Sequence, residues 1–243
     1  MNKDLERQIA EYEAKHQNIK IAYGGDGTVL AYVKKFPKAA IFPFRNYGLC
    51  EKHQDRLQKF LDGSENQKDL KQTLCPYLEV DVNGQVDRGI AEIVVKSYDI
   101  STALRFDLFI NDKLYMKNVI ADGMIVSTKY GSTGYFKSLS RCIFNCEGLG
   151  IAFIAPSQGI SNLVIDRTSK IKMIFKRDGV ISFSADKTVY PQFYVKENEA
   201  VKIEEFGGNA SIFGLEDFHC QACRTKRHSI YEFGEPIQDQ YAL

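Results

Sequence analysis

Apolar residues in the first part of the chain follow helical and strand-like spacings in turn. Leu5, Ile9 and Tyr12 recur every three or four residues among charges, which predicts an amphipathic helix over 3–17. Further elements are expected after it: strands over 19–23 and 39–44, and helices over 29–35 and 51–62. Alternating helices and strands are typical of a parallel α/β sheet.

The pattern changes near Pro76, where apolar and polar residues begin to alternate. Residues 78–82 alternate strictly, and Asn83-Gly84 then offers a hairpin turn. More strands are expected over 90–96, 104–110, 114–120, 123–126, 151–155, 171–175, 180–183, 193–195 and 201–206, with one helix over 131–141. Many short strands with close turns indicate a β-sandwich-like region.

These two textures divide the chain into domains. We expect an α/β domain over 1–75 and a strand-rich domain over 76–224. The remaining tail, 225–243, is expected to pack back on the first domain.

Charge and composition narrow the function classes. The chain has 32 Lys and Arg against 31 Asp and Glu, so no basic field favours nucleic acid as a partner. No stretch approaches the ~20 apolar residues that span a bilayer, and the charged N-terminus is not a signal peptide, so we expect a cytoplasmic protein without a membrane partner. Cys220 and Cys223 form a CxxC, but zinc needs two more ligands, and no metal site is assigned.

The segment 24–28, GGDGT, lies between a predicted strand and a predicted helix. Glycines let a phosphate chain lie against the backbone, and the helix N-terminus favours an anion. Asp26 is then a candidate general base or Mg²⁺-organising group. Thr28 is a candidate for capping the helix or for donating a hydrogen bond to a phosphate oxygen. The plainer interpretation is a tight turn in which Asp26 caps the helix.

A second segment, DGMIVSTKYGSTGY over 122–135, repeats this order of strand, loop and helix. Asp122 is suited to accept both hydroxyls of a ribose, and Tyr135 to stack on a ring. The small residues between them supply donors and close backbone approach: Ser127, Thr128, Gly131, Ser132, Thr133 and Gly134. The alternative is a polar loop with a helix cap at Ser132 or Thr133.

Together the two segments resemble the NAD kinase family. A third match is 45–48, Arg-Asn-Tyr-Gly, which is similar to that family's Asn-x-Gly segment, and the resemblance runs from about residue 19 to residue 195. It implies a Rossmann-like N-terminal domain joined to a β-sandwich-like C-terminal domain. It also implies transfer of a phosphoryl group from ATP or polyphosphate to the 2′-hydroxyl of NAD, with Mg²⁺ or another divalent ion, in a homodimer or homotetramer.

The resemblance also implies roles for individual residues. Asp26 would be the catalytic base. The ATP phosphates would be bound by Gly24, Gly25, Gly27, Thr28 and Asn46. NAD would be bound by Glu92, Asp122, Ser127, Thr133, Gly134 and Tyr135. No residue is assigned as a direct metal ligand.

The sequence departs from the family pattern at several positions. Ala91 stands where the family has Asn before the glutamate, and Lys129-Tyr130 stands where it has Pro-Thr. Asp186 is the counterpart of a late Asp-Gly element. Two alternatives stay open: a lipid or diacylglycerol-type kinase, which shares GGDGT, and a catalytically silent NAD(P)-binding relative.

Overall fold

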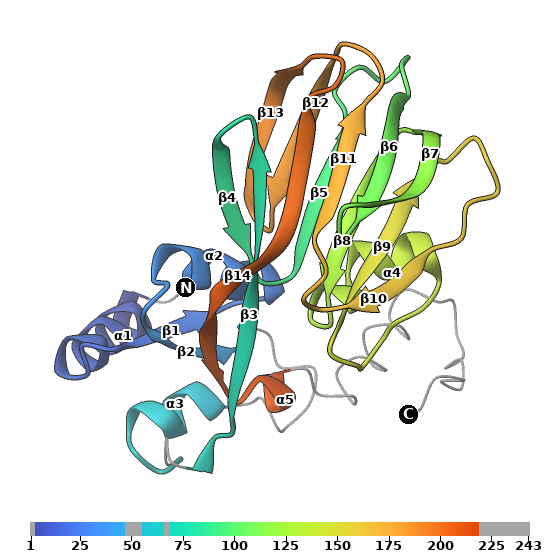
Figure 1. Cartoon of the computed structure of the whole chain (residues 1–243). Coiled ribbons are helices and arrows are strands. Elements are labelled where there is room, and N and C mark those ends of the chain that lie inside the picture. The colour runs from blue at the N-terminus through green and yellow to red at the C-terminus, as the bar shows by residue number, and fades with distance from the viewer. Residues whose placement is uncertain (1–2, 47–54, 66–68, 219–243) are drawn as a thin grey trace, which may run out of the picture. The chain divides into compact units, whose positions relative to one another are not determined.

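The computed structural model describes residues 3–46, 55–65 and 69–218. The chain forms two compact units (Figure 1). Unit 1 contains residues up to 74 together with those from 210 onward, and unit 2 contains 75–209. The second boundary expected from the sequence, residue 224, lies outside the described residues, as does the tail 225–243. No described helix is both long and apolar enough to cross a membrane.

Unit 1 has the α/β order that its sequence pattern predicts. Its elements in chain order are α1 (Lys3–Lys15), β1 (Ile19–Tyr23), α2 (Asp26–Lys35), β2 (Ala40–Phe44), α3 (Arg56–Leu61) and α5 (Leu215–Phe218). Strands β1 and β2 are parallel, and Ser211 and Ile212 pair in parallel with β2 on its other side. Part of the helix expected over 51–62 lies outside the described residues.

An aromatic core holds this unit together. Phe42 stacks on Phe213 with ring centroids 4.8 Å apart, and Phe60 packs against both Phe42 and Phe44. Ile21 of β1 and Ile9 of α1 complete the buried cluster. Each such fully buried apolar side chain contributes about 1.5–3 kcal/mol. The core therefore fixes the two parallel strands whose carboxyl ends carry the glycine turn.

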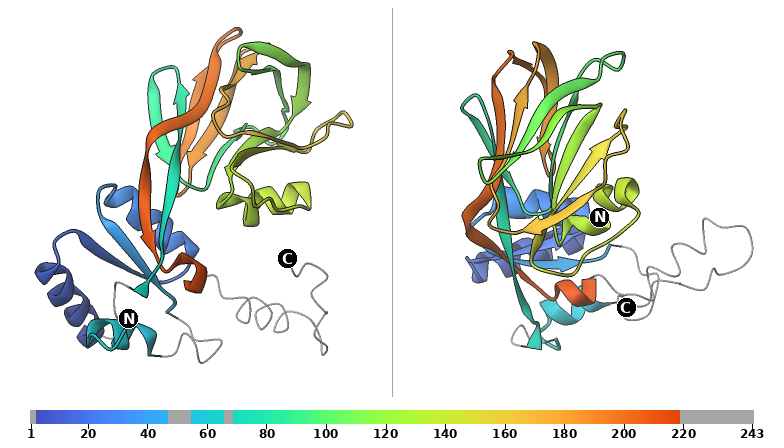
Figure 2. Two further views of the ribbon diagram at one scale, coloured as in Figure 1. Left: turned by 60° about the horizontal axis from the view of Figure 1, so that its bottom comes forward. Right: turned by 45° about the vertical axis from the view of Figure 1, so that its right-hand side comes forward.

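Unit 2 is a sandwich of two antiparallel sheets. One sheet contains β3 (Gln72–Val82), β4 (Gln85–Gly89), β6 (Leu104–Ile110), β7 (Lys113–Ala121), β11 (Ile171–Phe175) and the first part of β14 (Ala200–Phe213). The other has the order β10 (Leu163–Asp166), β9 (Gly148–Ile154), β8 (Gly123–Thr128), β5 (Glu92–Ser97), β12 (Gly179–Ala185) and β13 (Thr188–Val195). The further views in Figure 2 show the two sheets as separate layers.

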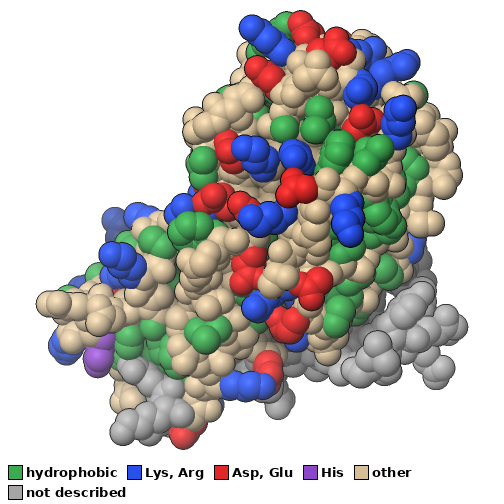
Figure 3. Space-filling model, in the orientation of Figure 1, with side chains coloured by type: hydrophobic (Ala, Val, Ile, Leu, Met, Phe, Trp, Pro, Cys, Tyr) green, Lys and Arg blue, Asp and Glu red, His purple; other side chains and the backbone are tan. Residues whose placement is uncertain are grey.

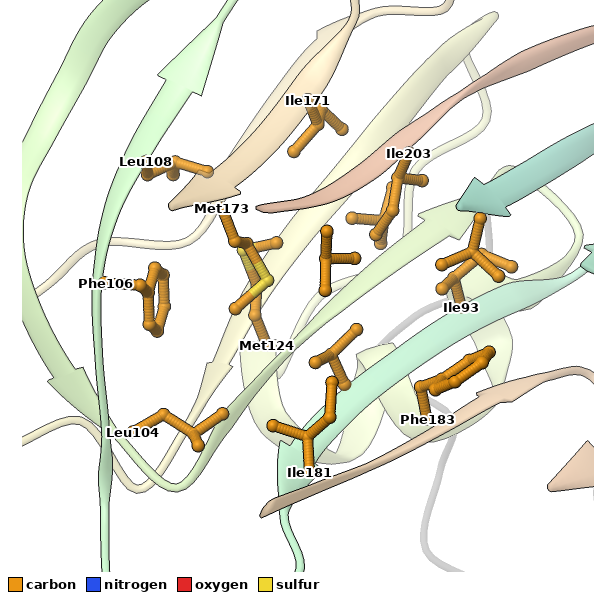
Figure 4. Packing of buried hydrophobic residues seen from close by; sticks show 14 of the residues in the cluster. Ile93, Leu104, Phe106, Leu108, Met124, Ile171, Met173, Ile181, Phe183 and Ile203 are labelled. Atoms are coloured by element: carbon orange, nitrogen blue, oxygen red, sulfur yellow. The ribbon is translucent and has the colours of Figure 1, made fainter. Parts of the chain in front are cut away.

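The core of unit 2 lies between its sheets. Phe106 and Met173 of one sheet meet Met124, Ile181 and Phe183 of the other (Figure 4). Side chains of alternate residues enter this layer, which is the period-2 pattern that predicted the strands. The β-sandwich-like class is therefore confirmed, and so is the Asn83-Gly84 turn, where both residues have positive φ, 51° and 85°.

Several elements differ from the sequence-based expectation. Strands β4 and β10 have no strong apolar alternation and were not expected; each forms by pairing with a stronger neighbour, β3 and β9. Strand β3 begins at Gln72 and runs through Pro76. The helix expected over 131–141 is instead a 3₁₀ turn over Gly131–Thr133 followed by α4 (Tyr135–Ser140). The break falls at Gly134, whose φ of −94° and ψ of −128° are not helical.

Charged side chains on unit 2 are mixed in sign. On the face shown in Figure 3, basic and acidic side chains are interspersed rather than gathered by sign. Several form ion pairs, including Arg88 with Glu79 and Arg167 with Glu205. This matches the balanced charge of the sequence.

Candidate functional site

The GGDGT segment forms the turn between β1 and α2. The amide of Gly24 donates to the carbonyl of Phe44 at 2.8 Å, which ties the end of β1 to the end of β2. A Cβ built on Gly24 would lie 2.2 Å from Thr28 Oγ1, so only glycine fits there. Gly25 is the N-cap of α2 and makes no side-chain cap bond. The first amides of the helix have no intrahelical acceptor, and they favour an anion at this position.

Asp26 is the first residue of α2 and is open to solvent. Since the capping position belongs to Gly25, the interpretation of Asp26 as a helix cap is wrong. Its side chain is 56% exposed. Asp26 faces Arg45, whose Nη2 lies 3.4 Å from Oδ1 and whose Nη1 lies 3.5 Å from Oδ2. An exposed carboxylate thus lies at the carboxyl end of two parallel strands, where α/β folds bind ligands.

Arg45 was not among the predicted site residues beyond its place in the Asn-x-Gly match. It follows β2, and its side chain is only 8% exposed. Asn46, which was expected to bind phosphate, comes next and is exposed. Tyr47 and Gly48 lie outside the described residues. A charged residue at the end of a buried strand run was the signal available in the sequence.

In unit 2, the hydroxyls at the end of β8 are used within the protein. Thr128 Oγ1 donates to the carbonyl of Ile90 at 2.6 Å and accepts the amide of Tyr130 at 3.2 Å. Ser127 is fully buried, and its Oγ donates to the carbonyl of Thr128 at 3.0 Å. Ser127 therefore shapes the loop and offers no hydroxyl to a ligand in this arrangement.

The accessible part of this loop follows the buried hydroxyls. Thr133, Gly134 and Tyr135 are exposed, with Tyr135 40% exposed. Gly131 turns the chain tightly, because a Cβ there would lie 2.2 Å from the carbonyl oxygen of Ala91. Phe136 is fully buried and anchors α4. The structure thus presents three of the predicted NAD-binding residues side by side on an anchored turn.

Glu92 stands next to this turn at the start of β5. It pairs in register with Ser127, and a Cβ on Gly134 would lie 3.7 Å from Glu92 Oε2. Oε2 is buried and has no hydrogen-bond partner among the described residues. Burial, together with the charge of Asp186, raises the pKa of Glu92 to about 7, although the backbone N–H groups of Phe136 and Tyr135 oppose the rise.

Asp186 fixes the segment that carries Glu92. Its carboxylate accepts the backbone N–H groups of Ile90, Ala91 and Glu92 at 2.7, 3.0 and 3.0 Å. Gly89 permits this approach, because a Cβ there would lie 2.7 Å from the carboxyl carbon of Asp186. The sequence pointed to Asp186 only as the counterpart of a late Asp-Gly element, and the three hydrogen bonds show what it does.

Asp122 does not join these residues within one chain. It precedes β8, where its amide donates to Ile154 and its carbonyl accepts from Ser97. Ser127 and the loop lie at the opposite end of the same extended strand. With a rise of about 3.3 Å per residue, the strand separates Asp122 from Ser127 by roughly 17 Å. Residues adjacent in the sequence motif are therefore far apart, because the motif includes a whole strand.

The remaining residues singled out in the sequence either form ordinary contacts or lie outside the described residues. Lys129 forms an ion pair with Glu147 at 3.7 Å. Among the residues that the structure describes, no group of three or more His, Cys, Asp and Glu could hold a metal ion. Cys220 and Cys223 lie outside those residues.

Comparison with known proteins shows which sequences this chain resembles. No family model matches the chain. Among curated proteins, it is 31% identical over 138 residues to NAD kinase 2 of Geobacillus kaustophilus, a match that covers 53% of this chain and 50% of that protein. It is 30% identical over 216 residues to the bifunctional NADP phosphatase/NAD kinase of Methanocaldococcus jannaschii, covering 84% of this chain and 37% of that protein. Over much of its length, the chain is similar to proteins of the NAD kinase family.

Solved structures of NAD kinases support the same fold. Yeast NADH kinase in complex with NADH superposes with a TM-score of 0.71 at 16% identity, over 91% of this chain and 68% of that one. An Archaeoglobus fulgidus NAD kinase in complex with ATP gives a TM-score of 0.67 at 21% identity, over 92% of this chain and 96% of that one. The family resemblance and the fold expected from it are confirmed. The chain spans half or less of the length of the two curated NAD kinases named above.

Proposed function

We propose that this protein is an NAD kinase, which transfers a phosphoryl group from ATP or polyphosphate to the 2′-hydroxyl of the adenosine ribose of NAD to give NADP. The observation that carries the proposal is the exposed carboxylate of Asp26 in a glycine turn, in a chain that is similar to NAD kinases. A carboxylate beside bound phosphates is costly unless it has a task, and proton removal is the task that phosphoryl transfer requires.

Asp26 acts as the general base in this proposal. Its carboxylate accepts the proton of the 2′-hydroxyl while the hydroxyl oxygen forms a bond to the terminal phosphorus of the donor. The bond from that phosphorus to the bridging oxygen breaks, and ADP or a shortened polyphosphate leaves with the electron pair. The products are NADP and protonated Asp26, which returns its proton to solvent through its exposed face.

The donor phosphates are assigned to the turn itself. Gly24, Gly25 and Gly27 leave the backbone open to phosphate oxygens, and the first amides of α2 face that anion. Thr28 and Asn46 are assigned as further hydrogen-bond donors to those phosphates. The helix dipole adds a favourable interaction with negative charge at the same end.

NAD is assigned to unit 2. Thr133, Gly134 and Tyr135 are the accessible residues, and Glu92 lies beside them with a buried oxygen. A carboxyl with a pKa near 7 is able to donate as well as accept a hydrogen bond at neutral pH, which suits hydroxyls and amines of a nucleoside. Ser127 acts by shaping the loop, and any ribose contact of Asp122 is made away from these residues of the same chain.

The divalent ion that the family resemblance implies fits the residues present. Mg²⁺ is commonly held by one or two carboxylates together with substrate phosphates and water. Asp26 is the exposed carboxylate at the turn. Together with the donor phosphates and water, it would be enough to hold the ion without further protein ligands. When bound, the ion would neutralise charge on the donor phosphates. The cytoplasmic location and the homodimer or homotetramer stay predictions.

Activity on defined donor and acceptor pairs tests the proposal. Purified protein is assayed with ATP or polyphosphate as donor, NAD or NADH as acceptor, and Mg²⁺ or Mn²⁺. We expect NADP from NAD with at least one donor. Asp26→Asn should lower kcat at least about a hundredfold while NAD binding by calorimetry is kept.

A matched variant and a competing assay complete the test. Asp69→Asn changes an exposed aspartate of the same unit and should leave kcat unchanged. A preparation that phosphorylates diacylglycerol vesicles but not NAD would contradict the proposal. So would tight NAD binding without turnover, which is the result for a silent relative.

A further inference from the structure

We propose that Arg45 is a positioning residue for Asp26: it orients the carboxylate and supplies the positive charge that lets this carboxylate and a polyphosphate share one turn. The inference rests on the proposed function, and it concerns a residue to which neither the motif nor that function gives a task. It is carried by the geometry around the guanidinium.

Arg45 is held rigidly from behind by Phe218. Its Nε donates to the carbonyl oxygen of Phe218 at 3.1 Å, and its guanidinium carbon lies 3.8 Å from the centre of the Phe218 ring. Phe218 is itself buried at the end of α5. A guanidinium stacked on one face and bonded at Nε has little freedom left, so its outer edge points in a fixed direction.

That outer edge faces Asp26. Nη2 lies 3.4 Å from Oδ1, and Nη1 lies 3.5 Å from Oδ2, so each nitrogen opposes one oxygen. Close charge-assisted bonds between these groups are about 2.7–2.9 Å. At 3.4 and 3.5 Å the two contacts are longer than this, and they set one guanidinium nitrogen opposite each carboxylate oxygen. A contact of this length with a half-exposed partner contributes little to folding, so stability does not explain it.

The guanidinium also lies against the backbone assigned to phosphate. A Cβ built on Gly25 would lie 4.0 Å from Arg45 Nη1, which is ordinary contact distance. The cation therefore borders both the carboxylate and the glycine turn. It offsets the repulsion between Asp26 and the donor phosphates.

Two substitutions separate orientation from charge. Arg45→Lys keeps the charge but replaces the planar fork with a point charge. It should hold KM for ATP within about threefold and lower kcat about tenfold. Arg45→Met removes the charge as well, and should raise KM for ATP about tenfold in addition to lowering kcat. NAD binding by calorimetry should be unchanged in both.

Two further variants guard against a purely structural effect. Lys71→Met breaks the exposed Lys71–Glu216 pair of the same unit, which has a length of 2.6 Å, and should leave kcat and KM unchanged. Phe218→Leu removes the aromatic platform but keeps the carbonyl acceptor, and should lower kcat less than Arg45→Lys. Thermal unfolding of every variant is measured beside the kinetics, and Arg45→Lys carries the test if Arg45→Met does not fold.

The outcomes distinguish this inference from the proposed function. If the wild-type protein makes NADP and Arg45→Lys retains its kcat, the inference is overturned and the function stands. Equal losses of kcat in Arg45→Lys and Lys71→Met, in step with lower thermal stability, would also overturn it. If the wild-type protein makes no NADP with any donor, the function and the inference fail together.

Discussion

The two carboxylates of the proposed site, Asp26 and Glu92, differ in exposure and in the charge of their neighbours. Asp26 of unit 1 is half-exposed and faces a fixed guanidinium. Glu92 of unit 2 is mostly buried and faces a second carboxylate, Asp186, with its pKa raised to about 7. An accessible, charge-balanced carboxylate is suited to take a proton during turnover. A buried one that shares a site with another acid is suited to hold a proton and fix the direction of a hydrogen bond.

The contrast has a structural origin. Asp26 follows a turn in which the backbone is bare, because two glycines precede it. Glu92 begins a strand whose approach is tied down by Asp186 through three backbone hydrogen bonds. The glycine turn leaves room for a ligand at the backbone, while the hydrogen-bonded segment holds Glu92 in a fixed position. The predictions below test these differences.

Removing the charge of Asp186 should have the largest effect on stability. Asp186→Asn keeps one acceptor oxygen but loses the charged bonds to three amides, so we expect a loss of about 3 kcal/mol in the free energy of unfolding. The pKa of Glu92 should also move down toward its ordinary value. Urea unfolding measures the first effect, and an unchanged midpoint would show that Asp186 does not hold this segment.

Filling the space above Gly131 should be the next largest effect. Gly131→Ala places a Cβ 2.2 Å from the carbonyl oxygen of Ala91, which is backbone and cannot turn aside. We expect a loss of about 2 kcal/mol and a higher KM for NAD. Gly159→Ala is the matched control, because nothing lies within 4 Å of its Cβ position. Similar unfolding midpoints for the two variants would contradict the tight turn.

The raised pKa of Glu92 predicts a pH-dependent stability. Its folded pKa lies above its unfolded value, so its contribution is fully present below about pH 4.5 and is lost as pH rises through about 7. We compare the free energy of unfolding of Glu92→Gln with that of the wild type at each pH. This difference should favour the variant by about 2 kcal/mol more at pH 8 than at pH 4.5. Urea unfolding at both pH values checks this. The same difference at both would mean that Glu92 titrates normally.

Tyr135 should show the smallest effect. Its exposed ring is available to stack on a nucleotide base, and stacking of this kind contributes about 1 kcal/mol. Tyr135→Leu should raise KM for NAD about fivefold with kcat and the unfolding midpoint unchanged. A change in kcat instead would give Tyr135 a role beyond binding.

Local patterns predicted the elements well and the long-range contacts poorly. Strands 19–23, 104–110 and 171–175 have the predicted bounds, because each combines strong apolar spacing with clear turn signals. Strands β4 and β10 were not predicted: β4 is polar-rich, and β10 has only four residues, too few to show an alternation. Propensity is a weak guide where pairing decides.

The candidate site shows the same limit. The glycine turn was predicted from strand, glycines and helix in sequence. Asp122 was grouped with the loop that follows it, although the extended strand between them separates the two. Arg45 is hydrogen-bonded to Phe218, and Asp186 to Ile90, and both partners lie far away in the chain. Contacts between residues so distant in sequence leave no local pattern to detect.

Steady-state kinetics of Asp26→Asn and Glu92→Gln, measured side by side with wild type, distinguish the roles of the two carboxylates. We expect Asp26→Asn to lower kcat at least about a hundredfold while NAD affinity is kept. We expect Glu92→Gln to keep kcat within about threefold and to raise KM for NAD about tenfold. If Glu92→Gln abolished kcat while Asp26→Asn retained it, the assignment of the two carboxylates would be contradicted.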